Sequence, residues 1–100
     1  MSIVGTYFVA HAEEGFTIKF NADSTCEYMS SHCEGATTLR GTYTFDSPNV
    51  TIHWTRRIEE NDEEGTTDQA VDINTNATAT VSGGAVTRVS YDGADMRRRG

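Results

Sequence analysis

GTYTFDSPNVTIHWTRR, residues Gly41 to Arg57, has the clearest strand pattern in the chain. Along its second half Val50, Ile52 and Trp54 alternate with polar residues, a period of two that places apolar side chains on one face of a strand. The segment before it has the same character, and Asp46 to Asn49 supply turn residues between the two. The stretch therefore predicts two antiparallel strands with one dry face and one wet face.

The composition extends this prediction to the whole chain. Its 100 residues fit a single domain. They include fifteen Thr, seven Val and five Ile but a single Leu, and β-branched side chains favour strands over helices. We therefore predict an all-β domain with almost no helix, whose core is just large enough to fill one small closed sheet.

Outward from the central hairpin, short alternating segments separated by turn residues predict further strands. We expect turns at Thr75 and Asn76 and at the Ser82-Gly83-Gly84 segment. Two regions lack sustained alternation, so 31–39 is predicted to be a loop or lid and 58–67 an exposed acidic loop. The eight predicted strands are 3–10, 16–20, 25–30, 41–45, 50–57, 68–74, 77–81 and 85–91.

Eight antiparallel strands joined by short turns are about the number that closes into an up-and-down barrel. A two-sheet β-sandwich is the alternative, and the sequence does not separate the two. The barrel domain is expected to span residues 1–93. Residues 94–100, which hold three consecutive arginines, are expected to be a flexible C-terminal tail.

Three segments together resemble the small bacterial lipocalin-like (calycin-type) β-barrel domains. They are GTY at Gly5 to Tyr7, GFTIKFNADSTCEY at Gly15 to Tyr28, and GTYTFDSPNVTIHW at Gly41 to Trp54. The family pattern has Gly after the Asp of the second segment, where this chain has Ser24. The resemblance implies an up-and-down barrel with a pocket that opens at one end.

Side chains expected to point into the barrel form a candidate ligand-binding set. Aromatic residues combine a large apolar area with the polar handles of Tyr and Trp, which suits a concave site. The same side chains are also the material for the core of so small a domain, and both interpretations stay open. The candidate ligand-binding residues are Phe16, Ile18, Tyr28, Tyr43, Phe45 and Trp54. We accordingly predict a non-enzymatic, lipocalin-like small binding protein that takes a small ligand at the barrel mouth or a protein partner.

The charge balance suggests a second function. The net charge of −7 argues against direct nucleic-acid binding, because affinity for phosphate comes from Lys and Arg. An acidic surface could instead dock on a basic partner, as an inhibitor of phage or mobile-element type does on a nucleic-acid-handling protein. The candidate partner-binding residues are Glu59, Glu60, Asp62, Glu63 and Glu64.

Metal and catalytic chemistry find little support in the sequence. The soft donors lack the paired spacing of a zinc site, and the EENDEEG run lacks the spacing of a calcium loop. Glu27 and His53 are the nearest approach to an acid–base pair, but both are predicted on wet faces. We predict no metal, no cofactor and no catalysis, with a small barrel enzyme as the further alternative. The soft donors are His11, His32, His53, Cys26 and Cys33.

Location and assembly are expected from what the chain lacks. No apolar segment has the length of a membrane helix and no secretory leader is visible, so we predict a cytoplasmic protein without membrane contact. In that compartment Cys26 and Cys33 are expected to be reduced, with a disulfide between the arms of a hairpin as the alternative. The first strand is apolar on both faces, which leaves a homo-oligomer open.

Overall fold

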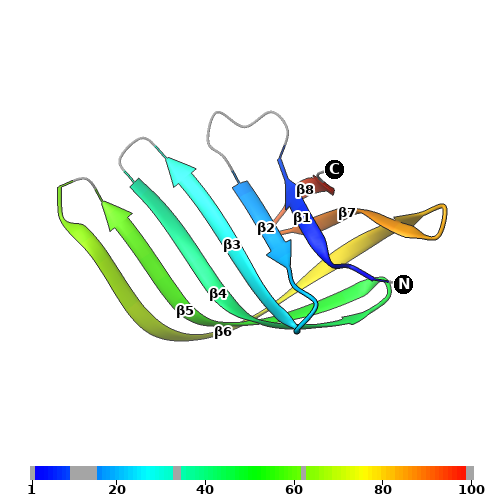
Figure 1. The fold of residues 1–100 in the computed structure, drawn as a ribbon, viewed down its shortest axis with the longest axis horizontal. Coiled ribbons are helices and arrows are strands. Elements are labelled where there is room, and N and C mark those ends of the chain that lie inside the picture. Colours follow the sequence, from blue (N-terminus) through cyan, green and yellow to red (C-terminus); the bar gives the residue numbers. More distant parts are fainter. Residues whose placement is uncertain (1, 10–15, 33–34, 62, 99–100) are drawn as a thin grey trace.

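The structure, a computed structural model, describes residues 2–9, 16–32, 35–61 and 63–98. Its strands are antiparallel and each pairs with the next along the chain, while the first pairs with the last, so the sheet closes into a barrel (Figure 1). This confirms the all-β up-and-down barrel over the sandwich. The described part contains no helix that could cross a membrane. The strands are β1 (Gly5–Phe8), β2 (Phe16–Phe20), β3 (Thr25–His32), β4 (Gly35–Asp46), β5 (Asn49–Asn61), β6 (Gly65–Ser82), β7 (Ala85–Tyr91) and β8 (Ala94–Arg98).

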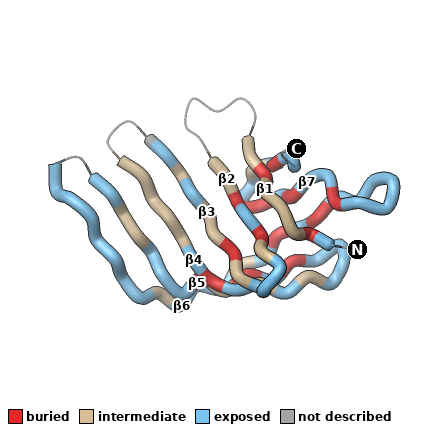
Figure 2. Tube along the Cα trace, viewed as in Figure 1, coloured by how far each residue is buried: buried red, intermediate tan, exposed pale blue. Residues whose placement is uncertain are grey.

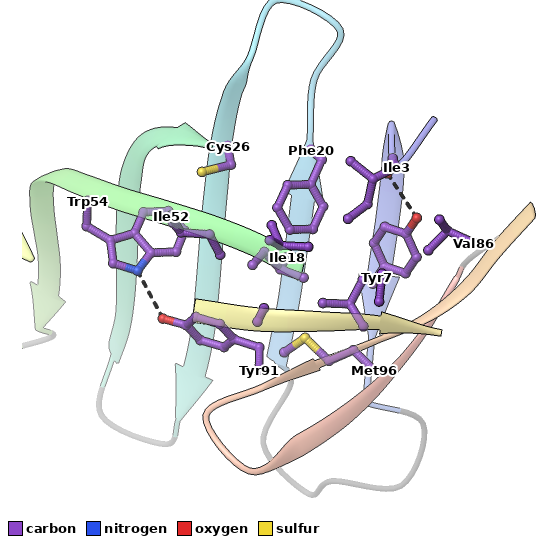
Figure 3. Packing of buried hydrophobic residues seen from close by; sticks show 14 residues of the cluster. Ile3, Tyr7, Ile18, Phe20, Cys26, Ile52, Trp54, Val86, Tyr91 and Met96 are labelled. Carbon is purple, nitrogen blue, oxygen red and sulfur yellow. Dashed lines mark hydrogen bonds between the residues drawn. The ribbon is translucent and has the colours of Figure 1, made fainter. Parts of the chain in front are cut away.

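The barrel interior is filled with side chains. A cluster of 14 buried hydrophobic residues occupies it, and Trp54, Tyr7 and Phe20 are the largest that are fully buried (Figure 3). The polar atoms of the aromatic residues find partners there, because the Trp54 indole N–H donates to the Tyr91 hydroxyl at 3.0 Å and the Tyr7 hydroxyl donates to the Ile3 carbonyl at 2.9 Å. Burying these side chains therefore leaves no cost for unmade hydrogen bonds.

Strands β3 to β6 are longer than the barrel requires and continue past it as a four-stranded sheet. We term residues 29–32, 35–40, 56–61 and 65–70 the extended sheet. Buried residues gather in the barrel, whereas this sheet is formed by exposed and half-buried residues (Figure 2). The molecule is consequently elongated, with extents of 46 × 29 × 21 Å.

Two register shifts mark the boundary between barrel and extended sheet. One lies at Arg40/Gly41 between β4 and β5, and the other at Trp54/Arg56 between β5 and β6. Such bulges bend a strand and increase its twist. A Cβ atom on the buried Gly41 would overlap the carbonyl oxygen of His53, so the close approach of β4 to β5 at this bend requires a residue without a side chain.

The barrel seam between β1 and β8 is short. Only Tyr7 with Arg98 and Phe8 with Arg97 pair across it in the described residues. The guanidinium of Arg98 adds two hydrogen bonds, donating to the Val4 carbonyl at 2.9 Å and to the Val86 carbonyl at 3.3 Å. This side chain therefore ties the segment before β1 to β7 and supports the closure.

The prediction of a flexible tail at residues 94–100 is wrong for residues 94–98. These form β8, which pairs with β7 on one side and β1 on the other, and Met96 is fully buried in the core. A single apolar side chain in this segment was too weak a pattern to predict a strand. Residues 99–100 lie outside the described residues.

The central part of the chain also corrects the predicted strands. The turn expected at Thr75 and Asn76 does not exist, because these residues pair with Ile52 and Thr51 inside the continuous strand β6. The loops expected at 31–39 and 58–67 are largely strand, being the ends of β3 and β5 and the beginnings of β4 and β6. The strand number stays at eight because β6 merges two predicted strands and β8 adds one.

Candidate functional site

The six candidate ligand-binding residues do not gather around one barrel mouth. Ile18 and Trp54 are core residues, 0% and 1% exposed, while the other four are half-buried and pack against the core. Tyr28 lies opposite Leu39 on the extended-sheet side of Gly41, whereas Phe45 lies opposite Val50 near the β4–β5 turn. The set therefore divides between the interior and the two ends of the barrel.

Tyr43 belongs to the end away from the extended sheet. Its hydroxyl donates to the Asn21 carbonyl at 2.8 Å, and its ring meets Phe20 edge to face at 4.8 Å between centroids. Burial raises the pKa of the Tyr43 hydroxyl. These contacts hold the β2–β3 turn against β4, which is a structural role.

A chain of aromatic rings leads from the extended sheet into the core. Phe16 stacks on Tyr28 with centroids 6.4 Å apart, Tyr28 lies 5.1 Å from Tyr91, and Tyr91 meets Trp54 edge to face at 6.2 Å. Burial raises the pKa of the Tyr28 and Tyr91 hydroxyls, so both stay neutral at physiological pH. Phe16 and Tyr28 are thus the accessible end of a packed aromatic series.

The face of the extended sheet that continues the barrel interior changes from apolar to polar with distance from the core. Residues opposite one another in register share a face, and successive cross-strand rows show the change. Near the barrel lie the half-buried Leu39 and Val71, with Ile73 41% exposed opposite Trp54. Further out the row runs from Ser30 through Thr37 and Glu59 to Thr67. This inner face therefore has an apolar rim and a polar outer part.

Among the described residues, the outer face of strands β3 to β6 carries three cross-strand ion pairs. Arg40 contacts Glu27 at 2.9 Å, Arg56 contacts Asp68 at 3.1 Å, and Nε2 of His53 lies 2.6 Å from Oδ1 of Asp72. Glu27 and His53 thus have different partners and form no acid–base pair with each other. All of these side chains are at least partly exposed, which is the environment of ordinary surface pairs.

The acidic residues collect at the tip of the extended sheet, around the β5–β6 turn. The backbone N–H groups of Glu63 and Glu64 donate to the Asn61 side-chain oxygen at 2.9 and 3.3 Å. Arg57 pairs with Glu59 at 2.6 Å, but within the described residues Glu60, Glu63 and Glu64 form no ion pair. Asp62 lies outside the described residues. The residues termed the acidic tip are Glu59, Glu60, Glu63 and Glu64.

A hollow of about 210 Å³ lies beside the acidic tip, between β4, β5 and β6. Its lining is more polar than apolar and carries acidic side chains, so it offers little apolar surface to enclose a small molecule. It is lined by Ala36, Thr37, Glu59, Glu60, Asn61, Glu64, Gly65 and Thr67.

The candidate metal ligands do not converge in the part of the chain that is described. No group of three His, Cys, Asp or Glu side chains there is placed to hold an ion. Cys26 is a free thiol in the core, and burial raises its pKa to about 12, so it remains protonated. His11, Cys33 and the side chain of His32 lie outside the described residues.

The sequence did not reveal one further feature, the unpaired edge of β6. This strand pairs with β5 from Gly65 onward, but β7 joins its other side only from Thr78. Between Gly65 and Ala77 no described strand pairs with that side, and Figure 1 shows this part of β6 running along the outside of the sheet. The run of Thr, Val and Ile without Pro was a signal for a strand here, which the acidic residues before it obscured.

No protein-family model matches the chain, and neither a curated protein nor a solved structure matches it. The closed barrel agrees with the fold that the lipocalin-like resemblance implies. Membership of that family remains a prediction.

Proposed function

We propose that the protein is a non-enzymatic binding protein that engages a protein partner through its extended sheet. The observation that carries the proposal is that four strands continue beyond a barrel already filled by its own side chains. Their extra length adds only the half-buried Leu39 to the packing around the core, but it presents a broad surface with an apolar rim at Phe16, Tyr28 and Ile73. Aromatic residues beside polar surroundings are the usual anchors of protein interfaces.

The electrostatics favour a basic partner. The net charge of the chain is −7, and three carboxylates of the acidic tip, those of Glu60, Glu63 and Glu64, form no ion pair within the described residues. A surface of one sign accelerates association with an oppositely charged surface. This supports the more specific candidate, an inhibitor that docks on a basic nucleic-acid-handling protein, as a second proposal within the same class.

The other two candidates have weaker support. A small ligand at the barrel mouth would need the six candidate residues together, and they are distributed through the core and both ends. For an enzyme, His53 and Asp72 lie on the outer face of the sheet and do not line the hollow beside the tip. An exposed pair of this kind lacks the water-excluding pocket that acid–base catalysis exploits.

A comparison of charge variants tests the proposal. The wild-type protein, a tip variant (E63Q and E64Q) and a barrel-end variant of equal charge change (D23N and D46N, in the β2–β3 and β4–β5 turns) would each be used to capture partners from the source cells. We expect wild-type protein and barrel-end variant to retain a partner that the tip variant loses, with binding that weakens steeply as salt is added. Equal capture by all three contradicts a role for the tip. A small metabolite that raises the melting temperature, with no protein captured, contradicts the proposed class.

A further inference from the structure

The unpaired edge of β6 is long and lies next to the acidic tip. At about 3.3 Å per residue the stretch from Gly65 to Ala77 extends roughly 40 Å. The register shift opposite Trp54 and Arg56 divides it, so the regular part nearest the tip is Gly65 to Ala70. We term Gly65 to Ala70 the free edge.

The free edge lacks most of the devices that usually protect such strands, and the charge of Asp68 is the one that it has. Natural edges are shielded by Lys, Pro, short length or a covering segment. Here the sequence GTTDQA contains neither Lys nor Pro, all six residues are exposed, and no described segment covers them. Alternate backbone N–H and C=O groups of this stretch are therefore available to another strand.

We propose that the free edge of β6 binds an extended basic segment of a partner protein as an added β-strand. This inference rests on the proposed function and specifies how the partner is held. Main-chain hydrogen bonds to the edge would supply affinity in strand addition, and alternate side chains would supply specificity.

The side chains along the edge indicate the chemistry of the added strand. Asp68 lies on the outer face, 44% exposed, and accepts from Arg56 through Oδ2, while within the described residues Oδ1 accepts no hydrogen bond. A Lys or Arg directly across the new ladder would lie about 5 Å away between Cβ atoms. On the inner face Val71 follows the free edge and is only half-buried, so an apolar residue of the partner fits there. The segment is therefore one in which basic and apolar residues alternate.

A second copy of the chain fits this edge less well. Pairing β6 with β6 about a two-fold axis would join two acidic edges, each carrying Asp68 and the 84%-exposed Asp72, on molecules of net charge −7. Like charges brought together across a ladder destabilise it. A basic segment from another protein meets the same edge with opposite charge.

The test uses an eight-residue peptide of alternating lysine and valine, acetylated and amidated, and two forms of it N-methylated at either the odd or the even backbone positions. In an added strand only alternate N–H groups point toward β6. We expect the parent peptide to bind at low salt and to slow amide exchange at alternate residues between Thr66 and Ala70. One methylated form should bind nearly as well as the parent, and the other should bind at least tenfold more weakly.

Two protein variants sharpen the result. Asp68→Asn should weaken binding of the lysine peptide while preserving the difference between the methylated forms, because the backbone contacts remain. Asp46→Asn, at the far end of the barrel, should leave both affinities unchanged.

Three outcomes would overturn the inference. Equal binding of the two methylated forms means that charge alone holds the peptide, which leaves the proposed function intact and removes strand addition. Failure of the parent peptide to bind at millimolar concentration also removes it. Concentration-dependent dimers with protected Thr66 to Ala70 amides, seen without peptide by sedimentation and exchange, would assign the edge to a second copy instead.

Discussion

Strand β5 passes through two different environments along its length. In its first half Val50, Ile52 and Trp54 are buried in the barrel core, and in its second half Arg57 and Glu59 face the same side of the sheet but are partly exposed. The backbone is equally well paired in both halves, with β4 on one side and β6 on the other. Strand pairing and core formation are therefore separate properties in this protein.

The extended sheet depends on the barrel for its stability. A sheet with little apolar burial is marginal by itself, and its stability comes from strands that are anchored in a packed core. Such regions open more readily than the core. The proposed binding surface thus lies on a part of the sheet that buries little apolar area.

The largest expected effect comes from truncating the core half of β5. Trp54→Ala removes the biggest buried side chain and the partner of the Tyr91 hydroxyl, so we expect a loss of about 3–5 kcal/mol in the free energy of unfolding. Ile58→Ala, on the half-buried part of the same strand, should cost roughly 1 kcal/mol or less. Urea unfolding followed by far-UV circular dichroism measures both. Similar losses for the two variants would contradict the difference between the core half and the extended-sheet half of β5.

Alanine substitutions at two glycines, one in the barrel and one in the extended sheet, should have effects of intermediate size. A Cβ atom at Gly41 would overlap the His53 carbonyl oxygen, and one at Gly35 would overlap that of Glu60. Gly41→Ala displaces backbone at the edge of the core and should lower global stability by about 1–3 kcal/mol. Gly35→Ala displaces backbone in the extended sheet, so its main effect should be faster amide exchange near Glu60. If Gly35→Ala lowered the free energy of unfolding as much as Gly41→Ala does, the predicted local effect would be wrong.

Alkaline pH should destabilise the barrel because its core contains a thiol and tyrosine hydroxyls that must lose a proton. Burial holds the pKa of Cys26 at about 12, above its ordinary value of 9.0, and also raises the pKa of Tyr7 and Tyr91. Each of these pKa values is higher in the folded than in the unfolded protein. The free energy of unfolding is therefore highest below about pH 9 and falls as the pH rises toward 12. Urea midpoints measured between pH 8 and 11 should fall, and less steeply for Cys26→Ala. A flat profile would count against this account.

The smallest effect is expected from the ion pairs of the extended sheet. Asp68→Asn breaks the exposed pair with Arg56 and should change the free energy of unfolding by about 0–1 kcal/mol, less at high salt. A loss above 2 kcal/mol would show that this pair supports the sheet in a way that its exposure does not suggest. Paired melts at low and high salt provide the measurement.

The barrel could be predicted from the sequence because its strands bury one face. The alternation at Val50, Ile52 and Trp54 indicates this burial directly. In β8 the buried face is marked only by Met96, which is too little to form a pattern. The extended sheet could not be predicted in the same way, since strands exposed on both faces need no alternation. Their pairing comes from continuing the β3–β6 ladders beyond the core.

The candidate site was predictable only in part. The cluster of acids at Glu59 to Glu64 was visible as composition. The structure places Glu59 and Glu60 in β5, and Glu63 and Glu64 in the short turn that follows at the tip of the sheet. The free edge of β6 depends on where β7 begins to pair, which is a property of the assembled sheet. Residue types alone do not encode it.

The seam at Arg98 has a consequence for how the chain folds. Every other pairing in the described sheet joins consecutive strands, whereas the bond from Arg98 to the Val4 carbonyl spans 94 positions. Hairpins between neighbours form with little loss of chain entropy, but joining the two ends of the chain is costly and slow. We therefore expect the hairpins to form early and the ring to close last, with Arg98 as the residue whose docking completes it.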